Sequence, residues 1–167
     1  IDSGLTYNSV PTTTISGLDH LEGETVSILA DGASHPNKTV SGGSITLDRS
    51  AQKVHVGLNY DSILQTLRLE AGSAAGVAQS KIKRINEITV RLHRTLGVEI
   101  GGDLENMENI PFRSSAALMN NPINLFSGDK KIELRDDYNT DGHVFVRQTQ
   151  PLPLTVLAIY PEVTVYD

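Results

Sequence analysis

The side chains best suited to chemistry stand at alternate positions of one run, Asp137, Asn139 and Asp141, with Gly142 directly after them. Oxygen ligands at positions one, three and five, followed by glycine at position six, match the opening of a calcium loop. We therefore take these three residues as candidate calcium ligands. The cofactor they imply is calcium, and the sequence suggests no other.

The same run has a simpler interpretation as a turn. The twelfth position of the loop is Gln148, which lacks the carboxylate that closes a calcium cage. Asp141-Gly142 ahead of the alternating residues Val144 and Val146 is also an ordinary hairpin signal. We favour the plain turn and keep the calcium site as the alternative.

A second polar group, Asp19, His20, Glu22 and Glu24, crowds one turn near the start of the chain. These residue types could hold a metal or transfer protons. Their spacing is not that of a helix-borne ligand set, so we expect an exposed polar turn.

Catalytic signatures are absent from the sequence. The chain has no cysteine, no Gly-x-Ser-x-Gly elbow, no phosphate-binding loop and no dinucleotide fingerprint. Its five histidines form no His-x-His or His-x3-His pair. We therefore expect a protein that is not an enzyme.

Positive charge gathers in one segment of an otherwise acidic chain of net charge −6. Such a balance argues against a whole-domain nucleic-acid binder, so any DNA contact must be local. We take Lys81, Lys83, Arg84 and Arg91 as candidates for a contact with a neighbouring subunit or with DNA. The alternative is a solvated face balanced by nearby Asp and Glu.

The elements that must position these residues are strands, because hydrophobic residues alternate with period two along most of the chain. In the basic segment, Ile88, Val90 and Leu92 share one parity with Arg84 and Arg94. Strands are expected at 25–30, 38–40, 44–47, 54–58, 64–70, 86–95, 130–134, 143–148, 155–160 and 163–166. Single helical turns are expected at 103–107 and 114–119, and a loop at 71–80.

This pattern predicts an all-β fold, an antiparallel β-sandwich or barrel body with a small inserted β-barrel-like module. The phrases Gly4-Leu5-Thr6-Tyr7 and Gly57-Leu58-Asn59-Tyr60 could mark one junction. We therefore expect a body of residues 1–16 and 57–167 with a module of residues 17–56, or else one single domain. The longest apolar run, 152–160, contains Pro153 and is too short for the roughly 20 residues of a membrane span, so we expect no membrane insertion.

Several phrases of the sequence resemble the C-terminal part of bacteriophage tail proteins of the nozzle or tail-tubular type. They are the stretches 17–32, 41–47, 53–60, 110–113, 125–129 and 150–159. The resemblance implies a virion structural protein that assembles as a homo-oligomeric ring, extends the DNA channel, and contacts other tail proteins or the host envelope. The long upstream region of such proteins is missing, which suggests a fragment.

The competing hypothesis is a carbohydrate- or receptor-binding β module of a phage tail, with calcium as a possible requirement. Aromatic residues make up only 5% of the chain, and there is no tryptophan. Sugar-binding platforms rely on aromatic faces, so this composition favours the structural role.

Overall fold

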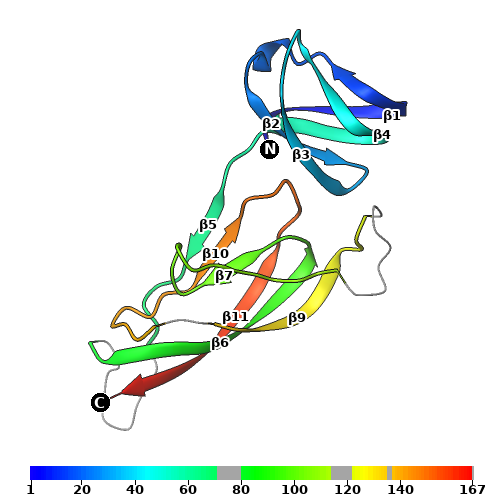
Figure 1. Ribbon diagram of the computed structural model, residues 1–167. Coiled ribbons are helices and arrows are strands. Elements are labelled where there is room, and N and C mark those ends of the chain that lie inside the picture. Colours follow the sequence, from blue (N-terminus) through cyan, green and yellow to red (C-terminus); the bar gives the residue numbers. More distant parts are fainter. Residues whose placement is uncertain (71–79, 114–121, 135–136, 167) are drawn as a thin grey trace. The chain divides into compact units, whose positions relative to one another are not determined.

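The computed structural model describes residues 1–70, 80–113, 122–134 and 137–166. Nearly all of its regular structure is antiparallel β, arranged in three sheets, which confirms the expected all-β, sandwich-like fold (Figure 1). Within these ranges the only helical element is the 3-10 turn η1 (Asp19–Leu21), and no helix there is long and apolar enough to cross a membrane. Residues 103–106 form bends instead of the expected helical turn, whereas 114–119 and most of the expected loop lie outside the described residues.

Contacts divide the chain into two compact units. The first comprises Ile1–Asp61 with two short returns, Arg113–Asn124 and Thr149–Leu152. The second comprises Ser62–Phe112, Leu125–Gln148 and Pro153–Asp167. Each unit has its own cluster of buried hydrophobic residues.

The first unit is one antiparallel sheet in the order β1-β4-β2-β3. Its strands are β1 (Asp2–Ser16), β2 (Thr25–Ala30), β3 (Ala33–Thr39) and β4 (Ser44–Leu58). Val26, Ile28 and Ala30 alternate into the core as the sequence predicts, and β4 adds Val54 and Val56. β4 is continuous where two separate strands were expected.

The boundary of the first unit differs from the expected one. β1 pairs with β4 along nearly its whole length, so residues 1–16 lie with residues 17–56 and not with the second unit. The starts of the two similar phrases do meet in space, since a Cβ on Gly57 would lie 2.9 Å from the Cα of Gly4. They lie inside the first unit, where the paired strands β1 and β4 approach closely.

The second unit contains two sheets. One has the order β5-β10-β7-β8, with β5 (Ser62–Gln65), β10 (Phe145–Gln148), β7 (Glu99–Gly101) and β8 (Glu108–Asn109). The other has the order β11-β6-β9, with β11 (Val156–Tyr166), β6 (Ile82–Thr95) and β9 (Phe126–Glu133). The core between them includes Ile88, Val90, Leu92, Ile100 and Val146.

An irregularity in β6 reverses which side chains face the core. The pairing with β11 shifts register between Glu87 and Ile85, which leaves Asn86 as an extra residue. An extra residue changes the parity of every side chain beyond it. As a result Lys83 and Ile85 join Ile88 on the buried side.

β11 forms one edge of its sheet and, among the described residues, pairs only with β6. His93 N–H donates to Thr155 O, so the odd-numbered residues of this part of β6 direct their backbone groups at β11. Pro161 lies opposite the even-numbered Ile88, and its nitrogen therefore faces the free edge.

Candidate functional site

A cavity of about 500 Å³ lies within the second unit. Its wall carries three carboxylates and three amides, from Asp103, Asp137, Asp141, Gln65, Asn106 and Asn139. Gly102, His143 and Phe145 complete the lining. All three candidate calcium ligands therefore face one cavity, together with residues from distant parts of the sequence.

Strand pairing brings these segments together. Phe145, the first residue of β10, lies opposite Gln65 at the end of β5 and opposite Gly101 at the end of β7. The chain that follows β7 supplies Gly102, Asp103 and Asn106. The cavity thus lies where three strands of one sheet end or begin.

Hydrogen bonds fix the conformation of the turn 137–142. The backbone of Asn139 makes two hydrogen bonds with that of Lys83, with N–O distances of 2.8 and 2.9 Å. Gly142 N–H donates to Asn139 Oδ1 at 2.6 Å, and the φ of Gly142 is +59°. A Cβ at Gly142 would lie 2.6 Å from Cδ of Lys83, so glycine is needed here.

This geometry favours the turn over a preformed calcium cage. Asn139 Oδ1 already accepts the Gly142 N–H, and Asp141 Oδ1 lies 2.9 Å from a guanidinium nitrogen of Arg68. Gln148 points elsewhere and donates to Leu96 O. No group of three or more His, Cys, Asp or Glu residues within 1–70, 80–113, 122–134 and 137–166 is placed to hold a metal.

An aromatic pair gives the cavity its apolar wall. The rings of His143 and Phe145 lie edge to face, with centroids 6.2 Å apart. His143 Nδ1 donates to Thr66 O at 2.8 Å, and Val144 N–H donates to Thr66 Oγ1 at 3.0 Å. These bonds fix the orientation of the imidazole next to Phe145.

The predicted basic contact is not one continuous patch. Lys83 is 0% exposed, and its ammonium donates to Leu69 O at 3.2 Å. Contrary to the expectation, Lys83 is therefore not part of an exposed basic face, because Asn86 shifts the parity of β6. Arg84 packs its guanidinium over the Tyr138 ring, 5.5 Å from the centroid, and half-buried Lys81 also has an interaction partner.

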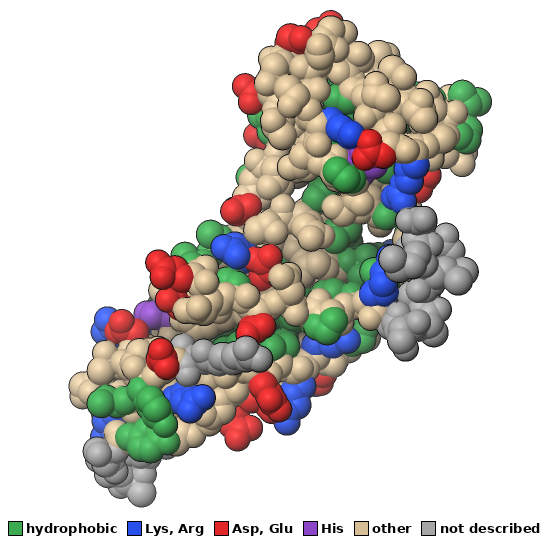
Figure 2. All heavy atoms as spheres, in the orientation of Figure 1, with side chains coloured by type: hydrophobic (Ala, Val, Ile, Leu, Met, Phe, Trp, Pro, Cys, Tyr) green, Lys and Arg blue, Asp and Glu red, His purple; other side chains and the backbone are tan. Residues whose placement is uncertain are grey.

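The fourth candidate, Arg91, is paired on the outer side of the sheet. Its Nε and Nη2 donate to the two carboxylate oxygens of Asp129 at 2.8 and 2.9 Å. The hydrogen bond from Arg91 lowers the pKa of Asp129 and raises the pKa of Arg91. Figure 2 shows basic and acidic side chains interspersed over the visible face of the second unit, in keeping with a balanced, solvated surface.

The polar turn near the start of the chain has structural contacts. Glu22 accepts hydrogen bonds from Gly42 N–H at 2.9 Å and Gly43 N–H at 2.7 Å, and these bonds lower its pKa, Gly43 having the larger effect. His20 Nε2 donates to Ser3 O at 2.9 Å. These contacts support an exposed polar turn that anchors neighbouring segments.

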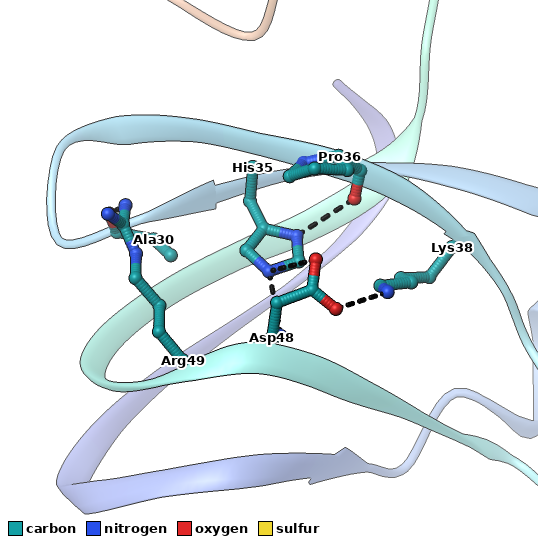
Figure 3. Close-up of polar contacts among 6 residues, drawn as sticks. All are labelled: Ala30, His35, Pro36, Lys38, Asp48 and Arg49. Atoms are coloured by element: carbon teal, nitrogen blue, oxygen red, sulfur yellow. Dashed lines mark hydrogen bonds and ion pairs between the residues drawn. The ribbon is translucent and has the colours of Figure 1, made fainter. Parts of the chain in front are cut away.

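Sequence reasoning missed a buried histidine in the first unit. His35 is 6% exposed, and its Nδ1 donates to Pro36 O at 2.8 Å while its Nε2 accepts Asp48 N–H at 3.0 Å (Figure 3). Lys38 pairs with the Asp48 carboxylate and lowers its pKa, chiefly through a hydrogen bond. His35 therefore ties β3 to β4. A lone histidine in a short strand gives no sequence signal for this role.

In comparisons with known proteins, no family model and no curated protein matches this chain. The resemblance to phage tail proteins therefore rests on the phrases of the sequence alone.

Proposed function

We propose that this chain is a non-enzymatic structural domain of a bacteriophage tail, of the nozzle or tail-tubular type. It works within the virion by contacting identical neighbours in a ring that extends the DNA channel, and it contacts other tail proteins or the host surface. The phrases of the sequence that resemble such proteins support this proposal. So does one feature of the second unit, the exposed apolar segment that begins with β5.

All four residues of β5 are exposed, although two of them are large and aliphatic. Ile63 is 52% and Leu64 46% exposed, and Leu67 just beyond the strand is 89% exposed. Single surface hydrophobic residues are ordinary, but three within five positions, two on the edge strand and one just beyond it, indicate a segment that another protein covers. We assign that surface to a neighbouring copy of the chain.

Light scattering coupled to size exclusion tests this assignment. We expect the purified chain to form a concentration-dependent oligomer, and the substitution Leu67→Asp to raise the dissociation constant by about tenfold or more. Ser62→Asp is the matched control, because it adds the same charge to the same exposed segment without removing apolar surface. A monomer at every concentration, or an oligomer equally stable in the Leu67→Asp variant, contradicts the proposal.

The cavity in the second unit favours a second candidate function, a carbohydrate- or receptor-binding module of a phage tail. The cavity combines amides, carboxylates and an aromatic wall. This combination is better suited to binding a polar ligand than a flat assembly surface would be. Binding to a panel of saccharides, measured with and without calcium, tests this second candidate.

A further inference from the structure

We propose that the cavity of the second unit binds an uncharged saccharide unit directly, without a bridging calcium ion. This inference rests on the second candidate function and names its site and its ligand class. It depends on four properties of the cavity: its size, its hydrogen-bonding groups, its charge and its rigidity.

The size of the cavity suits a small ligand. Ligand pockets in proteins have volumes of about 300–1,000 Å³, and this cavity measures about 500 Å³. A monosaccharide or the end of a longer glycan fits within such a volume. The cavity is too small to take a folded partner.

The polar groups of the wall match the hydroxyls of a sugar. Each sugar hydroxyl donates one hydrogen bond and accepts others, so its site needs both donors and acceptors. Gln65 and Asn106 supply amides with both functions from exposed positions. Asn139 also lines the cavity and uses its oxygen for Gly142 N–H, so its NH2 group is the part that can donate to a ligand.

The apolar side of a pyranose ring also has a counterpart. Phe145 lines the cavity and is held beside His143, whose ring is fixed by Thr66 O. Aromatic faces cover the C–H surface of a ligand and contribute through burial of apolar area. One aromatic wall with surrounding amides and carboxylates is therefore enough for a single sugar unit, despite the low aromatic content of the chain.

Charge restricts the ligand further. Asp103, Asp137 and Asp141 line the cavity, Asp141 being paired with Arg68 outside the lining, whereas none of the nine lining residues is lysine or arginine. Like charges at short range repel, so a uronic acid, a sialic acid or a phosphorylated sugar is disfavoured. The same argument disfavours a DNA phosphate in this cavity.

The site is organised before the ligand arrives. The turn 137–142 is pinned by the backbone pairing of Asn139 with Lys83 and by the Gly142 N–H bond to Asn139. Asp141 is held by its ion pair with Arg68. A fixed wall reduces the ordering cost of binding, and it leaves the Asn139 oxygen committed to the turn and not to a calcium ion.

The test is a titration of the isotope-labelled chain with neutral disaccharides of hexoses and N-acetylhexosamines, followed by amide NMR in the presence of a chelator. We expect at least one sugar to shift the amides of Gly102, Asp141 and His143, with a dissociation constant of about 1 mM. The corresponding glucuronic acid disaccharide should bind about tenfold more weakly or not at all.

Variants connect binding to the cavity. The exposed double substitution Gln65→Ala and Asn106→Ala should weaken binding by about tenfold, since two hydrogen-bonding groups are lost. Asn109→Ala is the matched control, an exposed asparagine of the same unit that does not line the cavity. Identical affinity in the double variant and the control overturns the proposal.

The remaining outcomes separate this inference from the function on which it rests. Saccharide binding that shifts amides away from the cavity overturns the inference and leaves the carbohydrate-binding function standing. Binding that appears only after calcium is added overturns the direct mode of binding. No binding of any saccharide overturns both the inference and the second candidate function.

Discussion

The role of Lys83 follows from its position in the fold and not from its charge alone. Its ammonium donates to the Leu69 carbonyl, and its stem packs beneath Gly142. Long basic side chains often contribute through the packing of their stems as well as through their charge. Lys83 is thus a support for the turn at the cavity.

Two substitutions of Lys83 distinguish support from surface contact. Lys83→Met keeps the stem and loses one hydrogen bond, so we expect the free energy of unfolding to fall by about 1 kcal/mol. Lys83→Glu places a carboxylate beside a carbonyl oxygen in a buried position, and a loss of about 3 kcal/mol or more is expected. Urea unfolding followed by circular dichroism measures both. Equal, small effects would show that the side chain is exposed in solution.

Glu22 predicts a pH dependence in the first unit. Hydrogen bonds from Gly43 N–H and Gly42 N–H lower its pKa below the ordinary 4.5. A lowered pKa in the folded state means that its contribution to stability is present above pH 4.5 and is lost as the pH falls through the folded pKa. Glu22→Gln should therefore flatten the stability profile at acidic pH. Thermal melts between about pH 3 and pH 6 test this, with Glu24→Gln as the control on the same turn.

At the scale of elements, the close approach of β1 and β4 depends on glycine. A Cβ on Gly57 would lie 2.6 Å from Asp2 O and 2.9 Å from the Cα of Gly4, both of them backbone atoms. Gly57→Ala must therefore push the two strands apart, and we expect a loss of about 1–3 kcal/mol in the free energy of unfolding. Gln52→Ala, an exposed change on the same strand, should have little effect. A Gly57→Ala variant as stable as Gln52→Ala would mean that β1 and β4 lie further apart at this position.

The strands that sequence periodicity predicted well are those with one buried and one solvated face. Ile88, Val90 and Leu92 of β6 alternate in this way, whereas Val26, Ile28 and Ala30 of β2 are buried together with Ser27 on the other face. Hydrophobic alternation persists wherever one face of a strand is buried, because burial selects apolar residues at every second position.

Two elements could not be predicted for physical reasons. β1 is mostly exposed along its length and includes Pro11, and only Ile15 is fully buried, so its buried face is too sparse to leave a regular pattern in the sequence. The extra residue Asn86 is an ordinary asparagine within a regular pattern, and its effect on Lys83 depends on pairing with β11. Local sequence does not specify such pairing.

The candidate site was predictable in part. The alternating oxygens of Asp137, Asn139 and Asp141 are visible in the sequence, and all three do face one cavity. Gln65 and Asn106 come from distant segments that only strand pairing brings to the same place. Their amide groups carry no local motif, so the ligand class suggested by the cavity could not be inferred before the fold was known.

At the scale of the whole molecule, each unit has a separate hydrophobic core. Val56 is fully buried in the first core, and Val56→Ala should lower the stability of that unit by about 1–3 kcal/mol. Hydrogen exchange should accelerate in β2 and β4 while the amides of β6 and β11 keep their protection. Equal loss of protection in both units would show that they unfold as one cooperative body.

Pro161 has a consequence for the behaviour of this chain at high local concentration. Its nitrogen faces the edge of β11 that no other described strand pairs with, and it has no hydrogen to donate. A strand added at this edge therefore cannot form a continuous ladder of hydrogen bonds. Fibrils grow by repeating an unbroken ladder from copy to copy. One proline thus makes the longest apolar edge strand of the second unit a poor template for amyloid, even when many copies are crowded together.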